Sequence, residues 1–328
     1  MRQLLRWFGV AVLVTLFGAV AALLLGPVPQ VDLTPQFNDE IIGDDLDAWL
    51  EKQEQAFPGI IPGTERQIVW AGPKGVKTPL AVVYLHGFSG TSVDISPVHD
   101  VVARELGANL YYSRLNGHGL DGPALGAATP ESWIRDTAEA LAIGRRLGEK
   151  VLVIGTSTGG TLATISALDP SLSKDISGVV LISPNFRMKP TNARILDLGF
   201  APIWAPILTG PEYASTPTSD DHAKYWTNPY PISALFNVAT LLRATKSLDP
   251  TKTNLPLLVL YSPDDQVVDV SYTKSFLENW SGPSRWEARQ MTTEDDPRSH
   301  MITGDIRSPA QTAPTIALIL DWVAGLEN

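Results

Sequence analysis

Seven short segments rich in apolar residues predict β-strands. They lie at residues 67–70, 80–85, 109–115, 151–154, 178–183, 255–261 and 285–291. Four of them, at 80–85, 151–154, 178–183 and 255–261, are almost continuously apolar. Runs of this length without alternating polar positions predict strands that are buried on both faces of a parallel sheet.

Segments with apolar residues three and four positions apart separate these strands and predict amphipathic helices. They lie at residues 44–57, 98–106, 130–147, 162–168, 232–246, 270–280 and 309–326. The segment 130–147 is the clearest, because Thr129 suits the N-cap, Pro130 the first turn and Gly148 the C-terminal cap. Strands that alternate with helices predict an α/β fold with a mostly parallel central sheet and helices on both faces.

The alternation stops between residues 186 and 246. No strand is predicted there, and prolines and aromatic residues recur. We expect this segment to form a helical cap over the carboxyl edge of the sheet, with 232–246 as its last helix. Among its aromatic residues are Trp204, Tyr213, Tyr225 and Trp226. The chain is thereby divided into an N-terminal segment 1–28, a first core part 29–185, the cap 186–246 and a second core part 247–328.

The N-terminal segment has the pattern of a transmembrane helix. Arg2 and Arg6 precede an uncharged apolar run at residues 7–25. As a helix this run would be about 28 Å long, close to the thickness of the hydrocarbon layer. Arginines on the leading side predict a cytoplasmic N-terminus, a membrane anchor and a body on the periplasmic or extracellular face. The alternative is a signal peptide cleaved near residues 19–21, which would leave a secreted protein.

Composition narrows the function classes. The chain has 328 residues, a net charge of −10 and no cysteine. An acidic chain without a basic stripe is not expected to bind nucleic acid, because phosphate binding requires clustered cations. The lack of cysteine excludes disulfides, thiolate metal sites and a cysteine nucleophile. No metal-ligand cluster or dinucleotide fingerprint appears, so we expect neither a metal nor a cofactor.

A candidate nucleophile lies between the strand at 151–154 and the helix that follows it. The sequence Gly155-Thr156-Ser157-Thr158-Gly159 has the Gly-x-Ser-x-Gly spacing of a nucleophile elbow. Such a turn holds its central residue in a strained backbone conformation that lifts the side chain clear of the sheet. The sequence therefore predicts Ser157 as a nucleophile.

Serine needs a general base, and histidine is the usual one near neutral pH. His300 lies in the loop after the last strand, at the edge where the elbow opens, and is the predicted base. Of the other four histidines, we expect His86 and His118 to brace their loops, and His99 and His222 to be surface residues.

The acid that orients the base is expected after the preceding strand. Asp265 is favoured over its neighbour Asp264, because 266–268 would pack the far side of the turn, and Asp269 is a third candidate. The oxyanion hole needs two backbone N–H groups. Thr158, at the start of the elbow helix, and Phe88, in the glycine-flanked loop after 80–85, are the predicted donors.

Five motifs together resemble the α/β hydrolases of the monoacylglycerol lipase, carboxylesterase and serine aminopeptidase group. They are His86-Gly87-Phe88-Ser89-Gly90, residues 114–119, the elbow, Asp265-Gln266-Val267-Val268, and His300-Met301-Ile302-Thr303. The resemblance implies an α/β-hydrolase fold with Ser157, Asp265 and His300 as a catalytic triad and Phe88 and Thr158 at the oxyanion hole. It also implies a carboxylic ester as the small-molecule substrate. The predicted anchor, together with Trp204 and Trp226 of the cap, extends this expectation to a lipid-derived ester.

Two alternatives stay open. A serine aminopeptidase would need a carboxylate near the site to hold the substrate ammonium group, and Glu212, Asp220 and Asp221 of the cap are the candidates. A binding protein could also keep the fold without turnover.

Overall fold

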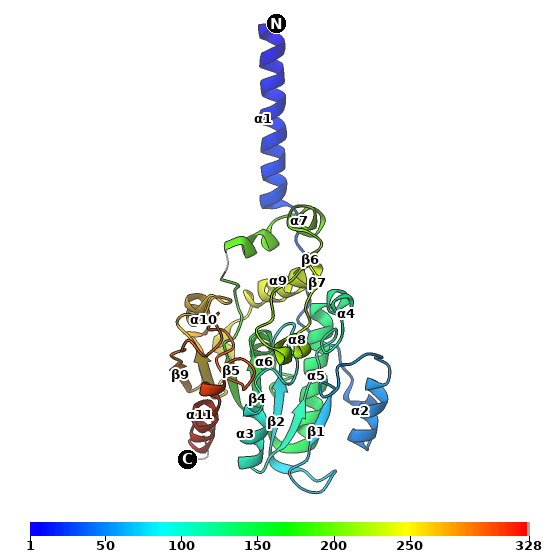
Figure 1. Ribbon diagram of the computed structural model, residues 1–328, viewed down its shortest axis with the longest axis vertical. Helices are drawn as coiled ribbons and strands as arrows, with labels where there is room; N and C mark the ends of the chain where they lie inside the picture. Colours follow the sequence, from blue (N-terminus) through cyan, green and yellow to red (C-terminus); the bar gives the residue numbers. More distant parts are fainter. Residues whose placement is uncertain (190, 327–328) are drawn as a thin grey trace.

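The computed structural model describes residues 1–189 and 191–326. At its centre is a seven-stranded sheet with the strand order β1-β3-β2-β4-β5-β8-β9 (Figure 1). The strands are Gln67–Val69 (β1), Thr78–Leu85 (β2), Asn109–Tyr112 (β3), Gly148–Thr156 (β4), Ile176–Ile182 (β5), Leu257–Tyr261 (β8) and Ser284–Ala288 (β9). β1 is antiparallel to β3, and all other neighbours in this sheet are parallel. The prediction of a mostly parallel sheet is therefore confirmed.

The central strands are apolar throughout because both of their faces are covered. Successive side chains of a strand point to opposite faces, so Val83 of β2 and Val153 of β4 belong to one core cluster. Val82 and Leu152 belong to a second cluster on the other face. The two clusters sandwich the sheet, which fixes the carboxyl ends of its strands in place.

Helices cover each face. Pro130–Leu147 (α5), Thr158–Leu168 (α6), Leu46–Glu54 (α2), Ser233–Thr245 (α9) and Val270–Leu277 (α10) contribute to the first cluster. Val98–Glu105 (α3) and Thr312–Ala324 (α11) pack on the second face. The remaining core helices are Gly122–Ala127 (α4) and the short 3₁₀ segments Asp39–Ile41 (η1), Pro250–Lys252 (η3) and Pro309–Gln311 (η4). Helix α4 was not predicted, since its six residues are too few to show helical periodicity.

The predicted cap contains Thr191–Asp197 (η2), Ala201–Thr209 (α7), Asp220–Tyr225 (α8) and the whole of α9. Residue 190 of the predicted cap, and residues 327–328 of the predicted second core part, lie outside the described residues. The expectation of no strand in the cap was wrong, because Glu212–Tyr213 (β6) pairs with Tyr230–Pro231 (β7). Strands of two residues are too short to show an alternating pattern, and Pro231 argued against one.

The N-terminal helix Arg2–Leu25 (α1) extends away from the body (Figure 1). None of its side chains is buried, and of the described helices it alone has the length and apolar composition to cross a membrane. Backbone hydrogen bonds join its end to the cap: Gly199 N–H donates to the Leu23 carbonyl at 2.7 Å, and Phe200 N–H to the Pro27 carbonyl at 3.0 Å. The base of α1 and the start of α7 are thus one structural unit.

Candidate functional site

Ser157 sits at the sharp turn between β4 and α6. Its φ is +51°, a left-handed value that non-glycine residues rarely adopt. The two flanking glycines are required by close backbone approach. A Cβ on Gly155 would lie 2.5 Å from the Gly159 carbonyl oxygen, and a Cβ on Gly159 would lie 2.0 Å from that of Leu85. The turn therefore has the strained geometry that the elbow spacing predicted.

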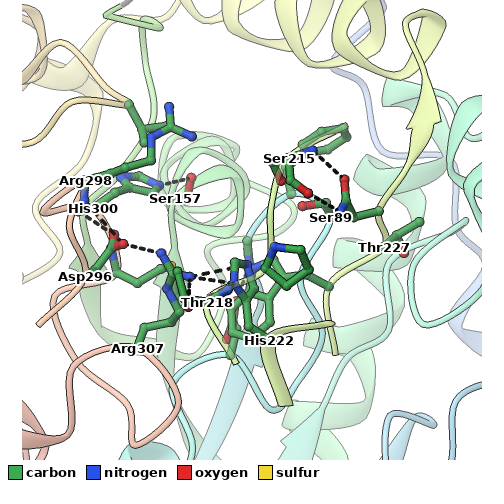
Figure 2. Close-up of a pocket in the computed structure, with 18 of the residues that line it drawn as sticks. Ser89, Ser157, Ser215, Thr218, His222, Thr227, Asp296, Arg298, His300 and Arg307 are labelled. Carbon is green, nitrogen blue, oxygen red and sulfur yellow. Dashed lines mark hydrogen bonds and ion pairs between the residues drawn. The ribbon is translucent and has the colours of Figure 1, made fainter. Parts of the chain in front are cut away.

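The structure brings together three side chains from the carboxyl ends of three different strands. His300 Nε2 lies 3.0 Å from Ser157 Oγ (Figure 2). On the other side of the ring, His300 Nδ1 lies 2.8 Å from Asp265 Oδ2. All three residues are buried. One histidine thus contacts a hydroxyl through one ring nitrogen and a carboxylate through the other, which is the arrangement that activates a serine.

The three candidate acids occupy different environments. The Asp265 side chain is fully buried, and its Oδ1 accepts hydrogen bonds from Val267 N–H at 2.7 Å and Val268 N–H at 2.9 Å. These bonds aim Oδ2 at the histidine. Asp264 is exposed on the turn, and Asp269 caps α10 by accepting from Tyr272 N–H at 3.1 Å. Only Asp265 of these three contacts His300.

Two of the other histidines brace loops. The ring of His86 accepts from Leu115 N–H at 3.0 Å, and His118 lies against Phe88 and Trp133. Burial lowers the pKa of His86 to about 4 and the pKa of His118 well below its ordinary value. Both rings are therefore held neutral.

The expectation that His99 and His222 are surface residues was wrong. His99 is fully buried in α3, and its Nε2 lies 2.6 Å from the Ser92 carbonyl. His222 is half-buried, and its Nδ1 accepts from Arg307 Nη1 at 2.6 Å. Burial and the nearby Arg307 charge lower the pKa of His222 to about 4. Helical position alone could not reveal either partner.

The region expected to bind an oxyanion lies where β2 and β4 end. Thr158 is the first residue of α6, so its N–H has no partner within the helix. Phe88 and Ser157 line the same cavity. Below them, the buried Asp94 accepts from Gly87 N–H at 2.9 Å and also from Tyr84 OH. Burial raises the pKa of Asp94 to about 6, although these hydrogen bonds pull it down.

Asp296 and Arg307 were missed by the sequence analysis. Asp296 Oδ2 accepts from His300 N–H at 3.0 Å and Met301 N–H at 2.9 Å, and its Oδ1 pairs with Arg307 Nη2. Although burial raises the pKa of Asp296, the Met301 N–H and the Arg307 charge outweigh that effect and leave the pKa lowered. The position of Asp296, four residues before His300, was the one available signal.

Arg307 also reaches the cap. Its Nη1 donates to Thr218 Oγ1 at 2.7 Å and to His222 (Figure 2). The loop that carries His300 is therefore tied to the cap through one guanidinium group. We call the set Thr218, His222, Asp296 and Arg307 the Arg307 clamp.

A cavity of about 310 Å³ opens above Ser157, at the small end of the range of ligand sites. Its lining is partly apolar, with Phe88, Met188, Tyr213, Trp226, Tyr230 and Val238. Of the four cap aromatics named from the sequence, Tyr213 and Trp226 line the cavity. Trp204 packs inside the cap instead and donates its indole N–H to the Gly199 carbonyl at 2.9 Å. Glu212, Asp220 and Asp221 are exposed and do not line this cavity in the described ranges. No three His, Asp or Glu side chains of residues 1–189 and 191–326 converge as a metal site requires.

Comparison with known proteins shows the family to which the chain is similar. A family model described as serine aminopeptidase, S33, matches residues 77–285. The thermostable monoacylglycerol lipase of Bacillus sp. (strain H-257) is 29% identical over 199 residues, which are 58% of this chain and 72% of that protein.

Solved structures are similar in fold. A structure from work on the metagenome-derived lipolytic enzymes LipS and LipT has a TM-score of 0.64 at 20% identity, covering 82% of this chain and 99% of that chain. The monoglyceride lipase of Saccharomyces cerevisiae has a TM-score of 0.57 at 14% identity, covering 82% and 97%. The monoacylglycerol lipase of Paleococcus ferrophilus has a TM-score of 0.56 at 16% identity, covering 80% and 99%. At these identities the likeness shows the fold alone, and it is the fold that the motifs predicted.

Proposed function

Because the chain belongs to the serine aminopeptidase (S33) family of α/β hydrolases, we propose that it cleaves carboxylic esters with Ser157 as nucleophile. The observation that carries the proposal is the chain of contacts from Asp265 to His300 at 2.8 Å and from His300 to Ser157 at 3.0 Å, at a strained turn. The relative of Bacillus sp. named as a monoacylglycerol lipase supports an ester as substrate.

The proposed reaction has two steps. Ser157 Oγ attacks the ester carbonyl carbon while His300 Nε2 takes its proton, and the same nitrogen then protonates the departing alcohol. Water, deprotonated by His300, attacks the acyl-enzyme and releases the acid. Asp265 stabilises the histidine cation without taking its proton. The N–H groups of Thr158 and Phe88 stabilise the oxyanion, each with about 3 kcal/mol.

The cavity favours an ester over a peptide N-terminus. An ammonium group needs an unpaired carboxylate, but Asp296 is neutralised by Arg307 and Asp94 is bonded to Gly87 and Tyr84. Arg298, which also lines the cavity, would repel a cation (Figure 2). The apolar lining suits an acyl chain, so we propose an ester or lipid-derived substrate.

We further propose that residues 1–28 anchor the chain in a membrane and place the core and the cap 186–246 on the periplasmic or extracellular side. The apolar length of α1 and the arginines at its start support this placement. Cleavage as a signal peptide would instead give a secreted enzyme, and the mass of the mature chain distinguishes the two.

Labelling with a fluorophosphonate probe tests the nucleophile. We expect the full chain in detergent to be labelled and Ser157→Ala not to be. Ser89→Ala is a matched control, since Ser89 also has a positive φ and lines the cavity. Faster hydrolysis of an aminoacyl amide than of an aryl ester would contradict the proposed substrate class, and no labelling of the folded chain would overturn the proposed activity.

A further inference from the structure

The cap carries an exposed apolar helix face beside the base of α1. Ile203, Ile207 and Leu208 of α7 are 69%, 80% and 74% exposed. The opposite side of α7, with Ala201 and Ala205, is buried in the cap. A helix with one face packed on protein and the other apolar and exposed is typical of a surface that meets a partner or a membrane.

The backbone contacts to α1 set the depth of this face. If residues 7–25 span the hydrocarbon layer, Leu25 lies at its boundary. Gly199 and Phe200, directly before α7, are hydrogen-bonded to Leu23 and Pro27 on either side of that point. Figure 1 shows α7 against the lower end of α1. The exposed face of α7 therefore lies at the level where acyl chains meet headgroups.

A basic cavity lies between the end of α9 and η2, the segment that directly precedes α7 in the chain. Its volume is about 390 Å³, and it is lined by Arg187, Lys189, Arg194, Arg243 and Lys246 together with Asp197 and Asp269. The two acids pair with Arg243 and Arg187. Lys189 donates to the uncharged carbonyl of Asp265. Within the described ranges, Arg194 and Lys246 are exposed and have no ion pair.

This concentration of cations contrasts with a chain whose net charge is −10. Arg243 Nη2 also donates to the Pro29 carbonyl at 3.3 Å, so the basic cavity borders the linker that follows α1. Lysine and arginine just outside the hydrocarbon layer are attracted to anionic lipid headgroups.

We propose that α7 and this basic cavity form a docking surface for a bilayer that contains anionic phospholipid. Ile203, Ile207 and Leu208 lie among the upper acyl chains, and Arg194 and Lys246 bind the headgroup phosphate. The inference rests on the proposed membrane anchor. Docking fixes on the bilayer the cap, which supplies part of the lining of the cavity above Ser157.

The chain contains no cysteine, so a single introduced cysteine is the sole site for a thiol-reactive label. The full chain is reconstituted in vesicles of phosphatidylcholine and phosphatidylglycerol with a bimane label on Ile203→Cys. Val76→Cys is the matched control, since Val76 is 53% exposed but lies in the β1–β2 loop at the far end of the body. Leu13→Cys reports the anchor.

We expect a lipid spin-labelled near the headgroup to quench the label at 203 severalfold more than the label at 76. Spin-labelled phosphatidylglycerol should quench it at least twice as strongly as spin-labelled phosphatidylcholine at the same mole fraction. Arg194→Gln/Lys246→Gln should bring this ratio close to one, whereas Lys52→Gln/Lys174→Gln, with the same charge change on exposed lysines, should leave it unchanged.

If the label at position 203 is as exposed to water as the label at position 76, while the label at position 13 is quenched, the docking surface is overturned and the anchor stands. A label at 203 shielded without lipid in a dimer would assign the face to a second copy and also overturn it. A ratio near one in the parent chain would overturn the anionic specificity. Ester hydrolysis by the same vesicles tests the proposed activity separately.

Discussion

The core and the cap are held together by different means. In the core, β2 and β4 pair over seven residues and β4 and β5 over six, and the central strands are buried on both faces. In the cap, β6 and β7 pair over two residues, and α7 leaves one apolar face exposed. The core is therefore a rigid support, whereas the cap has few contacts that fix it independently.

The candidate chemistry follows this division. Ser157, Asp265 and His300 come after β4, β8 and β9, so parallel strand ends bring them to one edge of the sheet. The cap supplies walls of the cavity and, through α7, a surface toward α1. The Arg307 clamp is the hydrogen-bonded link between a cap loop and the loop of the proposed base. We infer that the core determines whether the bond is cleaved and the cap determines which substrate arrives.

The largest expected effect lies entirely in the core. Asp265→Asn should lower kcat by roughly 10³- to 10⁴-fold, because the amide would favour the wrong histidine tautomer and would not stabilise the cation. The adjacent Asp264→Asn is the matched control, since Asp264 is exposed on the same turn. Steady-state hydrolysis of a short aryl ester measures both. Equal losses in the two variants would contradict the assignment of Asp265.

The Arg307 clamp tests whether core and cap act separately. Arg307→Gln should destabilise the protein by about 3 kcal/mol, because Asp296 would stay buried without its cation. We expect kcat to fall by about tenfold, since the loop of His300 loses its tie to the cap. Denaturant unfolding and ester hydrolysis measure the two effects.

Two further variants make this prediction specific. Arg298→Gln changes an exposed arginine of the same cavity and should shift stability by less than about 0.5 kcal/mol. Arg307→Gln/Asp296→Asn removes both buried charges and should recover part of the lost stability. If the double variant is as unstable as the sum of the single ones, the buried pair is not the cause.

Much of the core could be predicted because its signals are local. Four apolar runs predicted the central strands. The glycine spacing around Ser157 predicted the elbow, because both glycines are required by close backbone contacts within the turn and with Leu85. The order of Ser157, Asp265 and His300 along the strands placed them at one edge. The histidine of helix α3 was harder to interpret. The buried His99 was misjudged because its partner, the Ser92 carbonyl, is a backbone group without a sequence signature.

The cap and its link to the core could not be predicted in the same way. Arg307 contacts Thr218, 89 residues away, and no periodicity records a hydrogen bond between two loops. The paired strands β6 and β7 are too short to alternate. Trp204 packs inside the cap rather than against the cavity, and its place in an aromatic-rich segment could not show which of the two it does.

A pH-dependent prediction concerns Asp94, beneath the cavity in the core. Burial raises its pKa in the folded state to about 6, from an ordinary value of 3.8. The stability that this group contributes is therefore fully present below about pH 3.8 and is lost as the pH rises through 6. A shift of this size corresponds to about 3 kcal/mol. Asp94→Asn stays neutral, so its stability relative to the parent chain should rise by about that amount from pH 4 to pH 8.

Urea unfolding at pH 4, 6 and 8 measures this difference, in which the contributions of the other titrating groups cancel. Asp94→Ala removes the same titration but leaves Gly87 N–H without its acceptor. It should therefore be less stable than Asp94→Asn at every pH. Parallel pH curves for the parent chain and Asp94→Asn would contradict the effect of burial on Asp94.

The smallest expected effect separates the cap aromatics that line the cavity from those that do not. Tyr213 lines the cavity and stacks on Tyr230, with ring centroids 5.2 Å apart. Tyr213→Ala should raise KM for a long-chain ester by about two- to tenfold, because apolar contact with the acyl chain and the aromatic pair is lost. The KM for an acetyl ester should change by less than twofold, since a short acyl group does not reach the cap. Tyr225→Ala is the matched control, because Tyr225 is not among the described residues that line the cavity. If Tyr225→Ala shifts the chain-length preference as much as Tyr213→Ala does, the cap acts through its overall packing rather than through the cavity wall.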